Sequence, residues 1–439
     1  MSHRVTRHTN PEMALRNKVF FLFCLIKISI LTAAISLNGC AKRKQAETSP
    51  QMDAKPPFWV RVLLLDDVNN IRLNLNCSWS ISRPGLQKVH FRQPAESFKI
   101  NIQSGNLTIG ELNCDDAEIS IEPDSPYIFN INGSDYRGNL RLITNPDGNS
   151  FDAVNYVPLE PYLAGVISAE MPSYWEPAAL EAQAIASRTY CLFIKRRFGV
   201  NRHWDVKKTE AHQVYRGVAA ESGQIWKVVN KTAGKVLMCH LEDGSSDIFP
   251  AYYSSSCGGH TEDSRNVFGG AAYSPLMGVY CPYCEQTAKS LSLLWPEVTF
   301  DTNDISERLL QRYPVLKQLG KIVDIVPVRQ SEYHSRKENP QPDIVRLTQI
   351  KLAGSSGKFD FVRAEDFRCA IDPEGRKIKS AVFKIKSTDG CWLFYDGRGW
   401  GHSVGMCQCG AQAMARMEGK TAEQILLFYY PDSFIEYVY

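Results

Sequence analysis

The sequence lacks the charge imbalance that is typical of a nucleic-acid-binding protein. Its 439 residues carry 50 basic and 47 acidic side chains, a formal net charge of +3. After residue 39 no basic run is longer than the three residues of Lys42–Lys44, so the electrostatic footprint of a nucleic-acid partner is missing. Glycine and proline are few, 29 and 23, and follow no period, which excludes collagen and low-complexity chains. A repeat at a solenoid period is also missing.

What the sequence does contain is the composition of a globular protein. Hydrophobic residues make up 44% of the chain and charged residues 22%, which excludes a disordered chain or a coiled-coil rod. At about 100–200 residues per domain, two or three core-sized units are expected. Short runs of alternating apolar and polar residues with turn residues between them predict strands in the first part. The predicted fold class is α+β, with a strand-rich region over 58–150 and a mixed domain over 151–439.

The first 39 residues have the layout of an export signal. Basic side chains precede an apolar run from Val19 to Leu37, and Leu37-Asn38-Gly39-Cys40 follows; this order indicates a secretory signal peptide. Leu-x-Gly-Cys also resembles a bacterial lipobox, in which the cysteine is lipidated. We therefore predict a signal peptide over 1–39, a lipid on Cys40 and a polar tether over 40–57. An uncleaved membrane anchor and simple secretion are the alternatives. In each case the folded part is exported, and a lipoprotein would face the periplasm or cell wall.

Within the mixed domain, two adjacent helices with a short corner are predicted. Residues 159–171 have helical spacing, and Pro172 predicts a stop near Glu170, because a residue before proline avoids the helical conformation. The second helix begins near Glu176-Pro177, since proline is tolerated in a first turn. Further along, we predict strands and loops over 236–290, helix over 290–320, strands over 321–395, and a last helix that opens at Thr421 with a capping box to Gln424 and ends before Pro431.

Glu170 is the first candidate for chemistry because it lies at the helical corner. The negative end of the helix dipole disfavours ionisation of a carboxyl group there, and apolar cover from Met171, Tyr174 and Trp175 acts in the same direction. A carboxyl group that stays protonated near neutral pH is what a general acid needs. The alternative is a solvated glutamate in a turn.

A glycine-rich segment over 397–410 is the second candidate. Its glycines predict tight turns or a close approach of the backbone to a ligand. It does not have the Gly-Lys-Ser/Thr sequence of a phosphate loop. His402 and Gln408 are polar groups that this segment can direct at a substrate, and the alternative is that they bond their own backbone.

The cysteines form the third candidate. Eleven of the thirteen remain after Cys24 and Cys40 are set aside, and an odd number cannot all pair. Cys257 and His260, with Cys281 and Cys284, match a closed tetrahedral zinc site. Disulfides are the alternative in an oxidising compartment.

Two weaker interpretations concern the same residue types. One makes Cys257 a nucleophile with His260 as its base. The other makes His203 and His212 a metal pair, although surface histidines are the simpler interpretation.

Taken together, six segments resemble the sporulation stage II protein D family, also called the SpoIID/LytB or amidase-enhancer family. They occur in the family's order and are Leu159–Pro172 (LEPYLAGVISAEMP), Ala179–Tyr190 (ALEAQAIASRTY), Gln213–Gly217 (QVYRG), Ser256–Thr261 (SCGGHT), Gly399–Ala411 (GWGHSVGMCQCGA) and Ile425–Pro431 (ILLFYYP).

The resemblance implies a lytic transglycosylase of peptidoglycan, or an enhancer of a partner N-acetylmuramoyl-L-alanine amidase. It implies that Glu170 is the catalytic acid and that Arg188 takes part. Gln183, Tyr190, His402 and Gln408 are then the residues expected to contact the substrate. The bond cleaved would join N-acetylmuramic acid to N-acetylglucosamine in peptide-stripped glycan and leave a 1,6-anhydro end, in division or sporulation. No cofactor is implied for catalysis, and zinc would be structural.

The sequence departs from the family's pattern at three positions. Ser403 replaces a usual glycine, and Cys407 and Cys409 stand where serine and a large residue are common. Metal binding in some members maps to 203–215, where this chain offers only histidines, so that site is not carried over. A zinc-dependent hydrolase that uses Cys257 and His260 is a further alternative, which a closed site without an open position disfavours.

Overall fold

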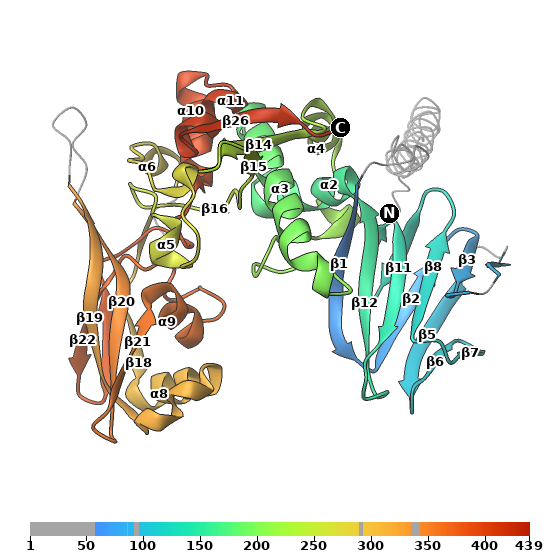
Figure 1. The fold of residues 1–439 in the computed structure, drawn as a ribbon, viewed down its shortest axis with the longest axis horizontal. Coiled ribbons are helices and arrows are strands. Elements are labelled where there is room, and N and C mark those ends of the chain that lie inside the picture. The colour runs from blue at the N-terminus through green and yellow to red at the C-terminus, as the bar shows by residue number, and fades with distance from the viewer. Residues whose placement is uncertain (1–57, 86, 92–95, 289–292, 335–342) are drawn as a thin grey trace, which may run out of the picture. The chain divides into compact units, whose positions relative to one another are not determined.

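The first part of the folded chain is strand-rich, as predicted, and its strands form two mainly antiparallel sheets (Figure 1). The computed structural model describes residues 58–85, 87–91, 96–288, 293–334 and 343–439. The predicted signal peptide, Cys40 and the tether lie outside these residues. In the described part of the chain, no helix is both long and apolar enough to cross a membrane.

The first sheet has seven strands and the second has six. Along the first sheet the order is β13 (Val206–Lys207), β1 (Trp59–Val68), β12 (Phe151–Pro158), β11 (Asn139–Thr144), β8 (Glu118–Pro123), β3 (Trp79–Ser82) and β4 (Val89–Phe91). Along the second it is β10 (Ser134–Arg137), β9 (Ile128–Ile131), β2 (Asn70–Leu75), β5 (Glu96–Gln103), β6 (Asn106–Ile109) and β7 (Leu112–Cys114). Alternate residues of strands such as β8 are buried, because successive side chains point to opposite faces. The inward residues of both sheets share one hydrophobic core.

The predicted helical corner is present. Helix α2 (Leu159–Glu170) ends at Glu170, and Met171 before Pro172 is extended, with φ −130° and ψ 144°. Helix α3 (Pro177–Phe198) begins with a proline in its first turn. Helix α2 lies beside β1 and β12 (Figure 1), and α3 contacts α2 and β13. The apolar residues of both helices belong to the same core as the two sheets. The strand-rich region and the helices therefore fold around one shared core.

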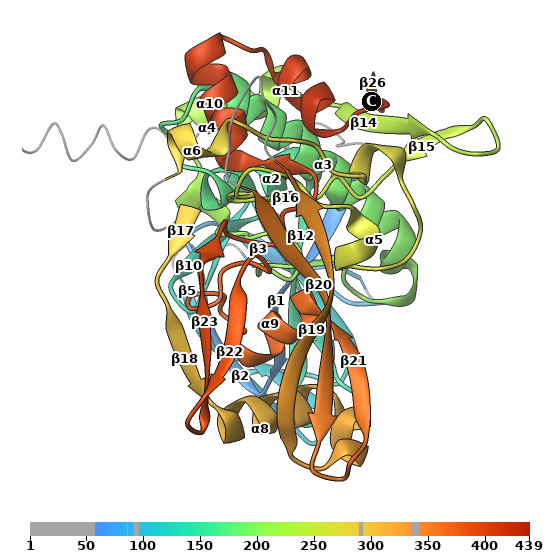
Figure 2. The same cartoon turned by 90° about the vertical axis from the view of Figure 1, so that its left-hand side faces the viewer.

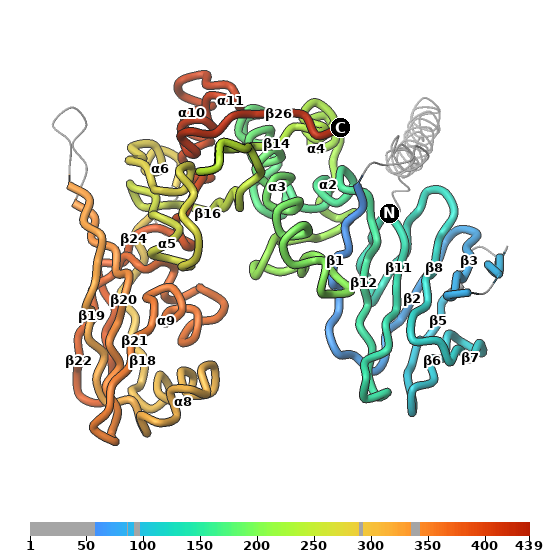
Figure 3. Tube along the Cα trace, viewed as in Figure 1, coloured from blue at the N-terminus to red at the C-terminus, as the bar shows by residue number. Residues whose placement is uncertain are grey.

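The end of the chain returns to the helices. Strand β26 (Ser433–Tyr437) pairs with β14 (Lys235–His240), which also pairs with β15 (Ser246–Ile248) (Figure 3). Helix α11 (Ala422–Tyr429) has the predicted capping box between Thr421 and Gln424. Helix α10 (Gln408–Glu418) was not predicted, and it begins inside the glycine-rich segment.

The remaining elements of this part are short. Between α3 and β14 lie 3-10 turns at Gly199–Asn201 and Gly217–Ala220 and helix α4 (Gly223–Lys231). Between β15 and α10 lie β16 (Tyr253–Ser254), α5 (Ser264–Val267), a 3-10 turn at Ser274–Leu276, α6 (Cys284–Thr287), β24 (Gly397–Arg398) and β25 (Met406–Cys407).

Residues 295–394 form a second hydrophobic core. Its strands are β17 (Leu294–Trp295), β18 (Val298–Asp301), β19 (Ile322–Tyr333), β20 (Ile344–Gly354), β21 (Phe359–Arg363), β22 (Lys384–Thr388) and β23 (Cys391–Tyr395), and its helices are α8 (Thr302–Arg312), the 3-10 segment Pro314–Leu319, and α9 (Ala364–Ile371). Strands β19, β20 and β21 lie side by side (Figure 2).

Two predictions for this part were wrong in detail. Within residues 294–320, the expected helix is interrupted by β17 and by β18, which pairs with β23, and α8 begins at Thr302, where the Asp301 side chain caps it. The strands expected over 321–395 are interrupted by α9, whose buried residues follow a helical spacing from Ala364 to Ile371.

Candidate active site

The carboxyl group of Glu170 lies at the C-terminal end of α2. It accepts a 2.6 Å hydrogen bond at Oε1 from the backbone N–H of Val214, and the side chain of Gln408 bonds to it as well. Burial raises the pKa of Glu170 to about 7 and the charge of Glu210 adds to the rise, whereas the two hydrogen bonds and the charge of Arg216 oppose it. Such a group is about half protonated near neutral pH, which suits a general acid.

One of the two rings expected to cover this carboxyl group is turned to solvent, and three other rings lie near it. Tyr174 is 77% exposed, so it does not cover Glu170. Burial raises the pKa of the phenols of Tyr162, Tyr190 and Tyr253, and the negative charge of Glu170 adds to the rise in all three. These tyrosines come from α2, α3 and β16, so three separate segments bring a phenol within the electrostatic influence of the acid. The predicted site residue Tyr190 is one of them.

A chain of amide side chains connects Glu170 with α3. The Nε2 atom of Gln408 donates a 3.3 Å hydrogen bond to Oε1 of Gln183. Gln183 in turn donates from Nε2 to the hydroxyl of Ser187 at 3.0 Å. Gln183 has no exposed surface and Gln408 is 5% exposed. The structure therefore brings these two predicted residues to Glu170, where their burial suits them to hold the carboxyl group in place.

Gln213 is a member of the site to which the sequence analysis gave no role. Its side chain is fully buried, accepts a 2.9 Å hydrogen bond from the Tyr162 hydroxyl and donates a 3.0 Å hydrogen bond to that of Tyr253. It stands next to Val214, whose N–H binds Glu170. The only sequence signal was its place in the third family-like segment.

The glycine-rich segment lies against residues 252–256, and this contact determines where Gln408 is placed. Strands β16 and β25 pair in parallel, and Ser256 forms a bridge with Trp400. A Cβ atom on Gly405, which has φ +68°, would stand 2.1 Å from the carbonyl oxygen of Tyr252. Glycine is thus required by the approach of one backbone to another, which is a structural reason independent of any ligand.

His402 lies in the same segment but packs among aromatic rings. Its ring centroid is 5.1 Å from that of Phe268 and 5.8 Å from that of Tyr252, and Nδ1 accepts a 3.0 Å hydrogen bond from the Val404 N–H. Burial lowers the pKa of His402 to about 4, although the charge of Glu365 opposes this. The imidazole is therefore neutral at neutral pH, and its contact with a substrate stays a prediction.

Arg188 has a structural position that differs from the expected catalytic one. Its guanidinium group is fully buried and binds the carboxylate of Glu160 with two hydrogen bonds of 2.8 and 2.7 Å. It also donates to the carbonyl oxygen of Lys235 at 3.0 Å, and the hydroxyl of Tyr439 donates to Glu160. A group without exposed surface does not reach a substrate, so Arg188 ties α3 to α2 and to the C-terminal residue.

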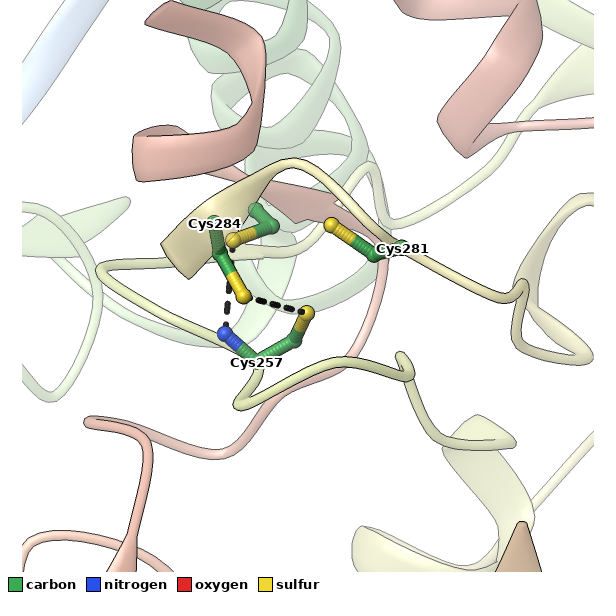
Figure 4. Close-up of side chains that lie close together, drawn as sticks. Cys257, Cys281 and Cys284 are labelled. Atoms are coloured by element: carbon green, nitrogen blue, oxygen red, sulfur yellow. Dashed lines mark hydrogen bonds between the residues drawn. The ribbon is translucent and has the colours of Figure 1, made fainter. Parts of the chain in front are cut away.

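The thiols of Cys257, Cys281, Cys284 and Cys407 form a buried cluster (Figure 4). Their sulfur atoms all lie within 4.8 Å of one another, so together they suit a structural metal ion. Three of these residues were predicted as ligands, but the fourth sulfur comes from Cys407 and not from His260. The ring of His260 instead stacks on Tyr333, with 3.6 Å between the ring centroids, because its segment turns toward the second core.

The two other histidines have separate partners. Nε2 of His203 lies 2.6 Å from a carboxylate oxygen of Asp152. Nδ1 of His212 accepts a 3.4 Å hydrogen bond from the Lys207 N–H, and its ring meets Trp204 edge-on.

Comparison with known proteins identifies the family. The model of the stage II sporulation protein family, SpoIID, matches residues 147–239, which include Glu170, Gln183 and Arg188. An uncharacterized protein of Brachyspira hyodysenteriae is 32% identical over 302 residues, which are 69% of this chain and 72% of that protein. This chain belongs to the SpoIID family.

Two relatives in Bacillus subtilis carry names that describe their roles. Stage II sporulation protein D is 29% identical over 63% of this chain and 74% of its own length. The amidase enhancer is 28% identical over 76% of this chain, and the match spans 49% of its own length, about half of that protein. SpoIID membership thus connects this chain with the cell wall.

The departure from the SpoIID pattern at Ser403 has a visible consequence. Ser403 has φ +64°, in the left-handed region that favours glycine. Ser403 is almost fully buried, and its hydroxyl has no hydrogen-bond partner within the described part of the chain. The backbone N–H of Ser403 donates to the Ser254 hydroxyl at 3.2 Å, a hydrogen bond that a glycine would make as well.

Proposed function

We propose that this protein is a peptidoglycan lytic transglycosylase and that Glu170 is its acid and base. The observation that carries the proposal is the partly buried carboxyl group of Glu170, with a pKa of about 7, at the end of α2. Membership of the SpoIID family supports the choice of peptidoglycan as substrate.

In the proposed reaction, protonated Glu170 donates its proton to the glycosidic oxygen between N-acetylmuramic acid and N-acetylglucosamine. The bond from that oxygen to the anomeric carbon breaks, and N-acetylglucosamine leaves with the proton. The Glu170 carboxylate then takes the proton from the 6-hydroxyl of the muramic acid. That oxygen closes onto the anomeric carbon and forms the 1,6-anhydro ring. One carboxylate is sufficient because no water is activated, in contrast to glycosidases with two carboxylates.

The residues around Glu170 support this dual role. The Val214 N–H and the Gln408 side chain both bind the carboxyl group. Both hydrogen bonds stabilise the ionised form, whereas burial stabilises the neutral form. The balance leaves both forms accessible near neutral pH, as an acid that must become a base requires.

A second candidate function is favoured by one relative, the amidase enhancer of Bacillus subtilis. In this second function the chain would bind the cell wall and stimulate an amidase without cleaving glycan. We also propose an amidase as a partner of the enzyme, because removal of stem peptides would supply the glycan that it cleaves. In either reading a metal ion has a structural role, since four thiols fill all positions of a tetrahedral site.

The test of the proposed function is cleavage of glycan strands freed of stem peptides by the full-length protein in detergent. We expect fragments with 1,6-anhydro ends by mass spectrometry. We expect kcat/KM to fall as pH rises through about 7, because the acid form of Glu170 is lost above its pKa. Intact strands at every pH, together with stimulation of an added amidase, would support the enhancer instead.

We further propose that a lipid on Cys40 holds the protein at a membrane, with the folded part exported toward the peptidoglycan. The order of a basic start, an apolar run and Leu37-Asn38-Gly39-Cys40 supports this. Several acyl chains on one cysteine give a stable anchor, whereas one chain binds only marginally. A flexible tether of about 17 residues would average roughly 20–25 Å in length.

For this anchor we expect a fatty-acid analogue to label the wild-type protein in cells but not the Cys40→Ala variant, which should accumulate as an unprocessed precursor. Cys24→Ala is the matched control and should still be labelled. An unlabelled wild-type protein of full length would indicate an uncleaved membrane anchor.

A further inference from the structure

Four thiols from three separate segments converge at one buried point. Cys257 follows β16, Cys281 precedes α6, Cys284 is the first residue of α6, and Cys407 ends β25. All four residues are without exposed surface. Single buried cysteines often pack as small apolar residues, but four thiols at one point can together bind either one another or a metal ion.

The spacing of the sulfur atoms favours a metal ion. The Sγ atoms of Cys257 and Cys284 are 3.9 Å apart, and all four lie within 4.8 Å of one another. Two sulfurs bound to one tetrahedral zinc ion at about 2.3 Å stand about 3.8 Å apart. A disulfide needs about 2.05 Å, and all four cysteines are unpaired in the structure.

The surroundings of the sulfurs also suit bound thiolates. The backbone N–H of Cys257 donates to Sγ of Cys407 at 3.3 Å, and the Tyr429 hydroxyl lies 3.1 Å from Sγ of Cys281. Gly410 leaves the room that this arrangement needs, because a Cβ atom there would stand 3.0 Å from Sγ of Cys281. Donors of this kind orient the ligands of a metal site.

The cluster is joined to the candidate active site through the chain itself. Cys407 immediately precedes Gln408, the first residue of α10, whose side chain binds Glu170. The parallel pairing of β16 with β25 joins Tyr253 to Met406 and Ser254 to Cys407. One ion bound to both Cys257 and Cys407 would therefore link the segment after β16 to the end of β25. This link would hold β16, which contains Tyr253, beside β25, which Gln408 follows.

We propose that Cys257, Cys281, Cys284 and Cys407 bind one structural zinc ion, and that this ion holds Gln408 against Glu170. Each thiol loses its proton when it binds. Gln408 is then a positioning residue that acts through Glu170. The zinc site stands independently of the reaction, whereas the effect on cleavage rests on the proposed function.

Metal analysis of the full-length protein tests the site. We expect about one zinc per chain, and cobalt in its place should give the absorption bands of a tetrahedral tetrathiolate. Cys407→Ser should lower the bound zinc at least about tenfold. The controls His260→Ala and Cys409→Ala, the latter at a buried cysteine outside the cluster, should retain it.

Wild-type protein without metal and with disulfides among these cysteines would overturn the site. So would zinc retained by Cys407→Ser and lost by His260→Ala. Because the cobalt spectrum is recorded on wild-type protein, it identifies the ligands as four thiolates even where a variant does not fold.

Hydrogen exchange tests the link to Glu170 without any activity measurement. On removal of zinc by a chelator, we expect faster exchange of the amides at 408–412, with α8 in the second core unchanged as the internal control. In cleavage, Gln408→Ala should lower kcat by about 10–100-fold with little change in KM. Met417→Ala, at a residue of the same helix that is 61% exposed, should stay close to wild type. Unchanged exchange at 408–412 would overturn the link. Absence of cleavage by the wild type would refute the proposed function, and the zinc and exchange results would still decide this proposal.

Discussion

Replacement of Glu170 by glutamine is expected to lower the rate of glycan cleavage by about 10²–10⁴-fold. Glutamine keeps the size of the side chain and can still accept the hydrogen bond from Val214 N–H that Glu170 accepts at 2.6 Å. It has no proton to give to the glycosidic oxygen and cannot take one from the 6-hydroxyl. The measurement is the initial rate of 1,6-anhydro product formation from peptide-free strands, with the thermal unfolding midpoint of both proteins recorded.

The matched control is Glu210→Gln, which removes an exposed carboxylate near the site. The charge of Glu210 helps to raise the pKa of Glu170, so this variant should retain cleavage with its pH limb moved to lower pH. An unchanged unfolding midpoint would show that Glu170→Gln is folded. Cleavage by folded Glu170→Gln at nearly the wild-type rate would remove the proposed enzyme function.

Replacement of Arg188 by alanine is expected to destabilise the fold by about 3–5 kcal/mol, because it leaves the Glu160 carboxylate buried without its partner. Glu160 is 5% exposed, and Arg188 is fully buried. The substitution also removes the hydrogen bond from Arg188 to the Lys235 carbonyl oxygen. Through Glu160, Arg188 connects α3 with Tyr439, and this connection is lost as well. The measurement is the free energy of unfolding from denaturant titration monitored by tryptophan fluorescence.

Arg196 on the same helix supplies the control. Its side chain is 63% exposed in an ion pair with Asp247, so Arg196→Ala should cost less than about 1 kcal/mol. The double variant Arg188→Met/Glu160→Leu should recover most of the stability, since it leaves no buried charge unpaired. If Arg188→Ala kept its free energy of unfolding and lost glycan cleavage, Arg188 would return to the catalytic role that the family resemblance implied.

Local rules explain the parts of the fold that were predicted correctly. Pro172 ends α2 at Glu170 through its effect on the preceding residue, and Pro177 opens α3. The capping box at Thr421 involves two residues three positions apart. Such signals act over a few residues, so they can be read without knowledge of the tertiary structure.

Predictions from local sequence patterns were wrong where strand pairing between distant segments decides the structure. Residues 298–301 are a strand because they pair with β23, which lies far along the sequence. The residue spacing of Ala364, Phe367 and Ile371 did carry a helical signal, but the strand patterns on both sides concealed it.

By itself, the sequence determined the helical corner, the position of Glu170 on it and three of the four clustered thiols. Only the tertiary structure decided that Cys407 completes the cluster, 150 residues from Cys257, and that Arg188 is buried against Glu160. It also supplied the Val214 N–H, 44 residues from Glu170, and the burial that raises the pKa of that carboxyl group. The physical reason is that helix ends depend on neighbouring residues, whereas burial and hydrogen-bond partners depend on which distant segments pack together.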